Sequence, residues 1–225
     1  MLPPFFLRGS AWLAYGESMN FRPKGDATLI QIVDSALADA ARKSGDWLVC
    51  RPGCTQCCYG PFPISQLDAA RLRDGMSELI KQDPARAVRV HRRARAYVKR
   101  LHDEFPGNPE TGILGEDEEA EARFEEFADD EPCPALDPAT GTCDLYAFRP
   151  MTCRTFGPPV RSGPEGGLGV CELCYHGATE VEIAACEMVP DPENRELKLI
   201  AQTEKKSGVR GNTIVAYCLR TLPGK

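Results

Sequence analysis

Several features that mark common protein classes are scarce in this chain of 225 residues. It has three histidines and two tryptophans, and no apolar run comes close to the roughly 20 residues that a membrane-spanning helix needs. The formal net charge is −6 and the pI is about 5.2, which argue against general binding to nucleic-acid phosphates. We therefore expect neither a membrane nor a nucleic acid as a partner.

The motifs of familiar enzymes are also missing from the sequence. We find no nucleotide-binding loop, no His-Glu-x-x-His zinc motif and no recognisable catalytic set of serine, histidine and acid. The glycine-rich stretch 161–169 is not a phosphate loop, because no lysine followed by serine or threonine comes after it. The sequence thus leaves catalysis open and names no substrate.

Residues 1–24 predict an irregular arm that contains several prolines. Arg8 interrupts the apolar residues near the start before they reach the length of a secretory signal, and Met19 offers an alternative start. Without a secretory leader, we expect a cytoplasmic protein in a reducing environment.

Cysteine, in contrast, is abundant. The eleven cysteines are Cys50, Cys54, Cys57, Cys58, Cys133, Cys143, Cys153, Cys171, Cys174, Cys186 and Cys218. The odd number and the adjacent pair Cys57 and Cys58 do not suit a disulfide framework. In a reducing compartment, clustered cysteines are typical of sites where thiolates bind zinc or an iron–sulfur cluster. The sequence therefore predicts a metal-binding protein.

The hydrophobic periodicity predicts a mainly helical fold with short β-hairpins, organised around the metal. We expect one domain over 25–220, with a helical insertion at 65–130. Helices are expected at 27–43, from 65, from 83, in the acidic stretch after 116, around 150, at 178–188 and at 192–206. Hairpins are expected at 133–143 and 161–169, a strand-like segment at 47–49, and a strand or short helix at 213–219.

Three residues are expected to cap helix N-termini: Asp26, Ser65 and Asp83, the last followed by Pro84. The helix after Asp83 carries many arginines on one face, and the acidic stretch follows it. We expect two solvated faces that partly neutralise each other.

The cysteine pattern resembles the YkgJ-type CxxCxxCC family of zinc- or iron-chelating domains. The resemblance rests on Cys50, Cys54, Cys57 and Cys58, and on the later runs Cys133-Pro-Ala-Leu, Gly-Thr-Cys143-Asp-Leu-Tyr146 and Arg149-Pro-Met-Thr-Cys153-Arg154. It covers roughly residues 50–175. One departure is the first gap, which holds three residues here where the family's name has two.

The resemblance implies eight cysteine ligands. Seven map onto Cys50, Cys54, Cys57, Cys58, Cys133, Cys143 and Cys153, and we take Cys174 as the eighth in preference to Cys171. We expect Cys54, Cys57, Cys58, Cys133, Cys143 and Cys153 to lie together. Cys186 and Cys218 are interpreted as buried apolar residues. His91 and His102 are interpreted as packing or surface residues, and His176 is the one histidine near the cluster.

Charge suggests which residues would surround such a site. Four thiolates around Zn²⁺ or a [4Fe–4S]²⁺ core leave about −2 on the assembly, which nearby cations and hydrogen-bond donors offset. Arg149 and Arg154 flank Cys153 and could serve; the alternative is that they are surface arginines beside a helix that begins at a proline. Tyr146 could donate a hydrogen bond to a sulfur or simply pack.

The choice of metal stays open between two arrangements. Compact cysteine spacing with a distant fourth cysteine favours a [4Fe–4S] cluster. Alternatively, Cys54 and Cys57 could join Cys171 and Cys174 in a four-thiolate zinc site. The leading hypothesis is a metal-binding protein for electron transfer, metal handling or assembly of a protein partner. The alternatives are a metal-dependent enzyme of unknown substrate and a thiol redox sensor that uses Cys57 and Cys58.

Overall fold

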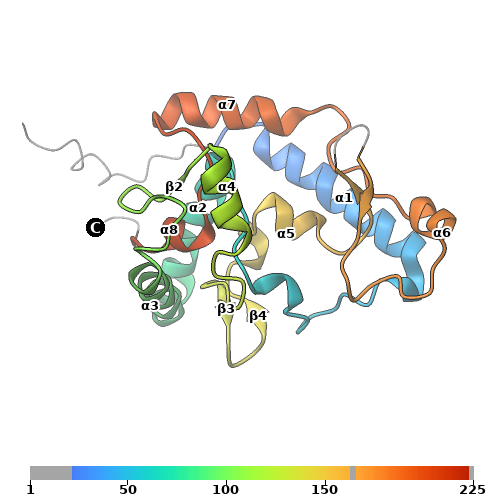
Figure 1. The fold of residues 1–225 in the computed structure, drawn as a ribbon, viewed down its shortest axis with the longest axis horizontal. Helices are drawn as coiled ribbons and strands as arrows, with labels where there is room; N and C mark the ends of the chain where they lie inside the picture. The colour runs from blue at the N-terminus through green and yellow to red at the C-terminus, as the bar shows by residue number, and fades with distance from the viewer. Residues whose placement is uncertain (1–21, 163–165, 223–225) are drawn as a thin grey trace, which may run out of the picture.

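The computed structural model describes residues 22–162 and 166–222, so most of the arm expected at 1–24 lies outside the described residues. The helices (Figure 1) are α1 Asp26–Ser44, α2 Gln66–Gln82, α3 Pro84–Arg100, α4 Glu118–Glu125, α5 Met151–Thr155, α6 Glu180–Ala185, α7 Arg195–Ser207 and α8 Val215–Leu219. Short 3₁₀ turns are η2 Gly45–Trp47, η3 Gln56–Cys58 and η4 Tyr146–Phe148. None of the helices in this part of the chain is long and apolar enough to span a membrane.

The strands of the described residues form three antiparallel hairpins, so the expectation of a mainly helical fold with short hairpins is confirmed. The pairs are β1 Gly107–Asn108 with β2 Ile113–Leu114, β3 Leu136–Asp137 with β4 Thr142–Cys143, and β5 Val160–Arg161 with β6 Leu168–Gly169. Two expected hairpins are therefore present. The final segment forms helix α8, one of the two alternatives.

Two helix starts follow the expected capping chemistry. The side chain of Ser65 accepts a hydrogen bond from the backbone N–H of Asp68, and that of Asp83 accepts one from Arg86 with Pro84 in the first turn. The expectation for Asp26 is wrong. The cap position of α1 is Gly25, and Asp26 lies inside the helix with its carboxylate turned toward the core.

The expected strand at 47–49 is also wrong. Trp47 ends the 3₁₀ turn η2, and Leu48 and Val49 lie outside any strand. The backbone carbonyl of Trp47 instead accepts a single hydrogen bond from the N–H of Tyr175, at 2.9 Å. This run is apolar because Trp47 and Leu48 pack against buried Cys171 and Cys174.

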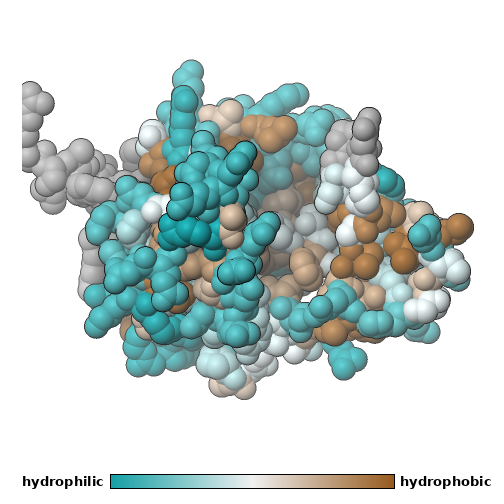
Figure 2. All heavy atoms as spheres, in the orientation of Figure 1, coloured by the Kyte–Doolittle hydropathy of each residue, from teal (hydrophilic) through white to brown (hydrophobic). Residues whose placement is uncertain are grey.

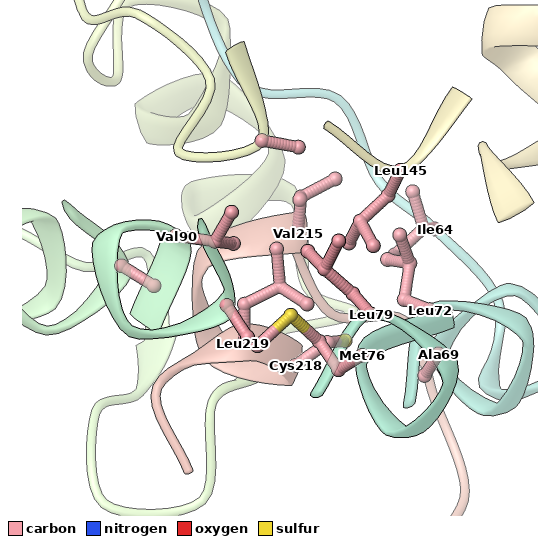
Figure 3. Packing of buried hydrophobic residues seen from close by; sticks show 13 residues of the cluster. Ile64, Ala69, Leu72, Met76, Leu79, Val90, Leu145, Val215, Cys218 and Leu219 are labelled. Carbon is pink, nitrogen blue, oxygen red and sulfur yellow. The ribbon is translucent and has the colours of Figure 1, made fainter. Parts of the chain in front are cut away.

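Helix α2 lies between two hydrophobic clusters. One face packs against α3 and α8, where Leu72, Met76, Val90, Val215 and Leu219 point toward one another (Figure 3). On its other side, Leu67 joins the cluster formed with α1 and α7. These helices therefore bury apolar faces against one another, which is the main favourable term in folding.

A buried ion cluster joins α1 to α2. The guanidinium of Arg71, which is 1% exposed, donates to Asp26 through Nε at 2.9 Å and through a second nitrogen at 2.6 Å, and to Asp68 at 2.5 Å. Asp68 also accepts a hydrogen bond from the backbone N–H of Met151 at 2.9 Å. The cluster thus fixes where α5 begins, immediately before Cys153.

Replacing Arg71 by Met should lower the free energy of unfolding by about 3 to 5 kcal/mol, because the buried carboxylates of Asp26 and Asp68 lose the guanidinium that they share. Urea unfolding measures the change. The control is Lys81→Met at the end of α2, whose side chain is 74% exposed and which should change stability by no more than about 0.5 kcal/mol. The additional change Asp26→Asn should recover part of the loss; a wild-type stability for Arg71→Met would contradict this view of the cluster.

Glu196 should make stability depend on pH. Burial, with the charges of Asp68, Asp191 and Asp26, raises its pKa from 4.5 to about 7, against the opposing charge of Arg71. The folded state therefore holds the proton more tightly than the unfolded chain. The stability that this proton gives is complete below pH 4.5 and is lost as the pH rises through about 7.

Glu196→Gln should accordingly be more stable than the wild type at pH 8, by on the order of 1 kcal/mol, and gain nothing near pH 4.5. Thermal or urea unfolding of both proteins across this range measures the difference, in which effects common to both cancel. Glu193→Gln, where the side chain is 66% exposed, is the matched control. A difference for Glu196→Gln that does not vary with pH would contradict the assignment.

Candidate metal centre

The first cysteine cluster lies on a looped segment between α1 and α2. The N–H of Cys54 donates to the carbonyl of Arg51 at 2.9 Å, and that of Cys58 donates to Thr55 at 2.8 Å, so two tight turns follow each other. Gly53 has φ of 91°, a left-handed conformation that glycine adopts without strain. The four cysteines of this segment therefore lie in and beside two consecutive tight turns.

A short antiparallel pairing brings Cys58 to Cys133. The N–H of Cys133 donates to the carbonyl of Cys58 at 2.7 Å, and the N–H of Gly60 donates to the carbonyl of Glu131 at 3.1 Å. The hairpin β3–β4 then places Cys143 opposite Leu136, whose N–H donates to the carbonyl of Cys133 at 2.9 Å. Backbone hydrogen bonds thus assemble three cysteines from two distant segments.

Cys153 joins these residues from α5. Its strongest electrostatic neighbours are the thiols of Cys133, Cys143 and Cys57, and burial raises its pKa well above the usual value. We call the five residues that gather here the inner thiol group: Cys57, Cys58, Cys133, Cys143 and Cys153. Cys133 and Cys143 also pack against the core cluster of α2, α3 and α8, which ties the group to the most buried part of the fold.

The remaining expected ligands lie elsewhere. The strongest thiol neighbours of Cys50 are Cys174, Cys171 and Cys54, and a hydrogen bond joins the side chains of Cys50 and Cys174. Cys171 in turn has Cys174 and Cys54 as its thiol neighbours. We call these four residues the outer thiol group: Cys50, Cys54, Cys171 and Cys174. Cys54 thus lies beside Cys50 and Cys171, and the expectation that it shares a site with Cys57 stays a prediction.

The thiols of the inner group differ in acidity. A hydrogen bond with Cys58 lowers the pKa of Cys57 to about 6, assisted by its own backbone N–H and the charge of Arg149. Burial raises the pKa of Cys133 to about 12. Cys58, hydrogen-bonded to Cys57, has a raised pKa. One thiolate at Cys57 is thus stabilised by neighbours that stay protonated.

Arg149 and Arg154 play different parts. Arg149 is 9% exposed, and its charge helps to lower the pKa of Cys57 and opposes the rise in the pKa of Cys143 that burial causes. Arg154 is 2% exposed. It donates hydrogen bonds to the backbone carbonyl of Ala147 at 2.6 Å and to the carboxylate of Asp34 at 2.7 Å. Arg149 therefore lies beside the thiols, while Arg154 supports the turn from which Arg149 extends.

Tyr146 does not bind a sulfur in this structure. Its side chain is largely exposed, and its ring lies against Arg149, with the guanidinium carbon 4.0 Å from the ring centroid. Arg149 also donates to the carbonyl of Tyr146 at 2.9 Å. The tyrosine thus orients the arginine by a cation–π contact.

One functional neighbour was missed by the sequence reasoning. Arg93 belongs to the basic face of α3, which was interpreted as solvated. It donates to the carbonyl of Pro134 at 2.9 Å and to the buried carboxylate of Asp144 at 2.5 Å, and its charge opposes the rise in the pKa of Cys133. The pattern of arginines on α3 did not indicate that Arg93 lies beside the thiols, because its partner Asp144 is distant in the sequence, beyond the acidic stretch.

The other cysteines and the histidines lie where packing explains them. Cys218 is 5% exposed in the cluster of α2, α3 and α8, and Cys186 is 4% exposed beside Cys171 and Cys174. His91 contacts the carbonyl of Leu219, and His102 forms exposed ion pairs. His176 is exposed and lines a cavity of about 600 Å³ with Trp47 and Tyr175.

A second cavity of about 460 Å³ lies between the two thiol groups. Cys57 and Cys153 line it from the inner group and Cys171 from the outer group, with Tyr59 and Phe156 among its apolar walls. Figure 2 shows that this face of the molecule is hydrophilic over α3 and α4, more apolar near α6, and hollowed near its middle. The thiols therefore border space that is open to solvent.

The donor set fits a soft metal. Nine thiols lie in two groups, and the nearby carboxylate of Asp144 is occupied by Arg86 and Arg93. Across the described residues, no three cysteine, histidine or acidic side chains already point at one shared position as metal ligands. Metal binding would thus require rotamer changes at the thiols, as is common where ligands are ordered by the metal itself.

Comparison with known families agrees with this chemistry. A family model named CxxCxxCC, described as a putative zinc- or iron-chelating domain, matches residues 49–163, just over half of the chain. Searches of curated proteins and of solved structures returned no match. The match covers the whole inner thiol group with Cys50 and Cys54, and it ends before Cys171. The chain belongs to the CxxCxxCC family of cysteine-cluster domains.

Proposed function

We propose that the inner thiol group coordinates an iron–sulfur cluster of the [4Fe–4S] type and that the chain serves as an iron–sulfur protein. The observation that carries the proposal is the gathering of five thiols from three separate segments at one place. A cluster of this type needs about four thiolate ligands, so the group supplies enough even if only one of Cys57 and Cys58 binds.

The surroundings favour a cluster over a single ion. The ligands come from a turn, a hairpin and a helix, and two of them, Cys57 and Cys153, line a cavity of about 460 Å³, which gives more room than one zinc ion needs. Arg149 and Arg93 supply positive charge beside the thiols, and a cluster with four thiolates carries about −2. Buried charge of this size is tolerated only with such compensation.

The bound cluster would supply one-electron transfer. The chain's own residues hold the thiols in place, bury Cys133 and Cys143 against the cluster that contains Leu145, and offset the charge. The exposed apolar residues Tyr59 and Phe156 at the cavity give a protein partner a surface on which to exchange electrons. Because ligation requires reduced thiols, we place the protein in a reducing cytoplasm.

Analysis of protein purified without oxygen tests the proposal. We expect iron and acid-labile sulfide in equal amounts, about four of each per inner group, and broad visible absorption that bleaches on reduction. Protein with zinc alone would contradict the cluster and leave a structural or catalytic zinc site. Metal-free protein with a Cys57–Cys58 disulfide, identified by mass spectrometry, would contradict it in favour of a thiol redox pair.

Serine substitutions should separate ligands from packing residues. Cys143→Ser and Cys153→Ser should each lose more than half of the iron, because a hydroxyl is a harder and less acidic ligand than a thiolate. Cys218→Ser should keep the iron and lose about 1 to 2 kcal/mol of stability, since it places a hydroxyl among apolar side chains. Metal analysis and urea unfolding measure both; iron retained in Cys143→Ser and Cys153→Ser would remove the inner group as the binding site.

A further inference from the structure

We propose that the outer thiol group, Cys50, Cys54, Cys171 and Cys174, forms a second metal site that binds one zinc ion through four thiolates. It extends the proposed function by treating these thiols, too, as metal ligands. Two of the four ligands, Cys171 and Cys174, lie beyond the part of the chain that the family model matches.

The fold holds the two ligand loops side by side. The N–H of Tyr175 donates to the carbonyl of Trp47 at 2.9 Å, just outside the four cysteines on both loops. The side-chain amide of Gln56 donates to the carboxylate of Glu172, which lies 116 residues later in the chain. The segments 47–56 and 172–175 are thus joined at both ends, with Cys50, Cys54 and Cys174 between the two links and Cys171 next to Glu172.

The thiols themselves meet across these loops. Cys50 and Cys174 are hydrogen-bonded through their side chains, and so are Cys171 and Cys174. A methyl group built on Gly157 would lie 3.2 Å from the sulfur of Cys50, and the carbonyl of Gly157 accepts a hydrogen bond from the N–H of Cys171 at 3.4 Å. Gly157 therefore lets Cys50 approach the loop that carries the other pair.

Each loop has the form of a zinc-binding turn. The spacings Cys50-x₃-Cys54 and Cys171-x₂-Cys174 both fall within the two to four residues typical of paired zinc ligands. In each, the second cysteine donates its N–H into a tight turn, to Arg51 and to Cys171, both at 2.9 Å. Such turns keep the two cysteines of each pair close together along the chain.

The surroundings explain why zinc suits this group. Cys171 and Cys174 are each 4% exposed and pack with Trp47, Leu48 and Ile183, in a cluster separate from the main helical core of α2, α3 and α8. This apolar cluster is small, so the burial of its side chains contributes little stability. A bound metal would add to it. Four thiolates complete the coordination of Zn²⁺ and leave no position for a substrate, so the site would be structural.

The backbone conformation at Tyr175 indicates that contacts outside the outer thiol group fix the position of this loop. Tyr175 directly follows Cys174 and has φ of 60°, which is uncommon for a residue other than glycine. The hydroxyl of Tyr175 is hydrogen-bonded to the buried hydroxyl of Ser44 at the end of α1. The chain thus turns sharply after the second ligand and is fixed to α1 at that point.

Metal analysis of single variants tests the proposal. We expect one zinc per wild-type chain, and Cys54→Ser and Cys174→Ser should each lose at least four-fifths of it while keeping the iron of the inner group. Cys186→Ser is the matched control, because Cys186 is 4% exposed in the same apolar cluster yet outside the proposed ligand set. It should keep both metals. Zinc retained in Cys54→Ser and Cys174→Ser would overturn the proposal.

Two measurements on the wild-type chain keep the test decisive if a variant does not fold. The zinc absorption edge should show four sulfur neighbours at about 2.3 Å. Alkylation with mass spectrometry should find the four thiols protected until the zinc is removed. Absence of zinc, or a disulfide between Cys50 and Cys174, would overturn the proposal. Zinc without iron would overturn the proposed cluster instead, and iron without zinc would overturn only the second site.

Discussion

The cysteine site depends on one short backbone pairing. Two hydrogen bonds, from Cys133 to Cys58 and from Gly60 to Glu131, join the first cysteine segment to the segment that leads into the hairpin β3–β4. Without this pairing, nothing in the backbone would bring Cys57 and Cys58 close to Cys133 and Cys143. The pairing has few bonds and little apolar burial, so it needs help from the helices around it and from whatever the thiols bind.

The helices supply part of that help. The ion cluster of Arg71, Asp26 and Asp68 joins α1 to α2, and Asp68 also receives the N–H that begins α5 (Figure 1). The position of Cys153 is thus set by a buried charge cluster on other helices. Helices α1, α2, α3, α7 and α8 bury their apolar faces in two clusters that contain no proposed cysteine ligand. Cys133 and Cys143 only pack against the edge of one of them.

The sequence predicted what local chemistry determines. Ser65 and Asp83 cap helices as expected, since a cap depends on residues only three positions away. Asp26 resembled a cap but pairs with Arg71, a partner that no local pattern reveals. Likewise, spacing suggested one set of ligands around Cys54 and Cys57. Only the three-dimensional path of the chain shows Cys50 and Cys54 beside Cys171 and Cys174, because more than 100 residues separate the two pairs in the sequence.

The central claim is that the cysteine loops need bound metal to stay ordered, whereas the helices are stable without it. Hydrogen–deuterium exchange of the native protein before and after metal removal tests it most directly. We predict that exchange becomes at least ten times faster in 50–60, 131–145 and 168–176, while the amides of α2 and α3 keep their protection and the helical circular dichroism persists. Unchanged protection of the cysteine loops after complete metal removal would contradict the account.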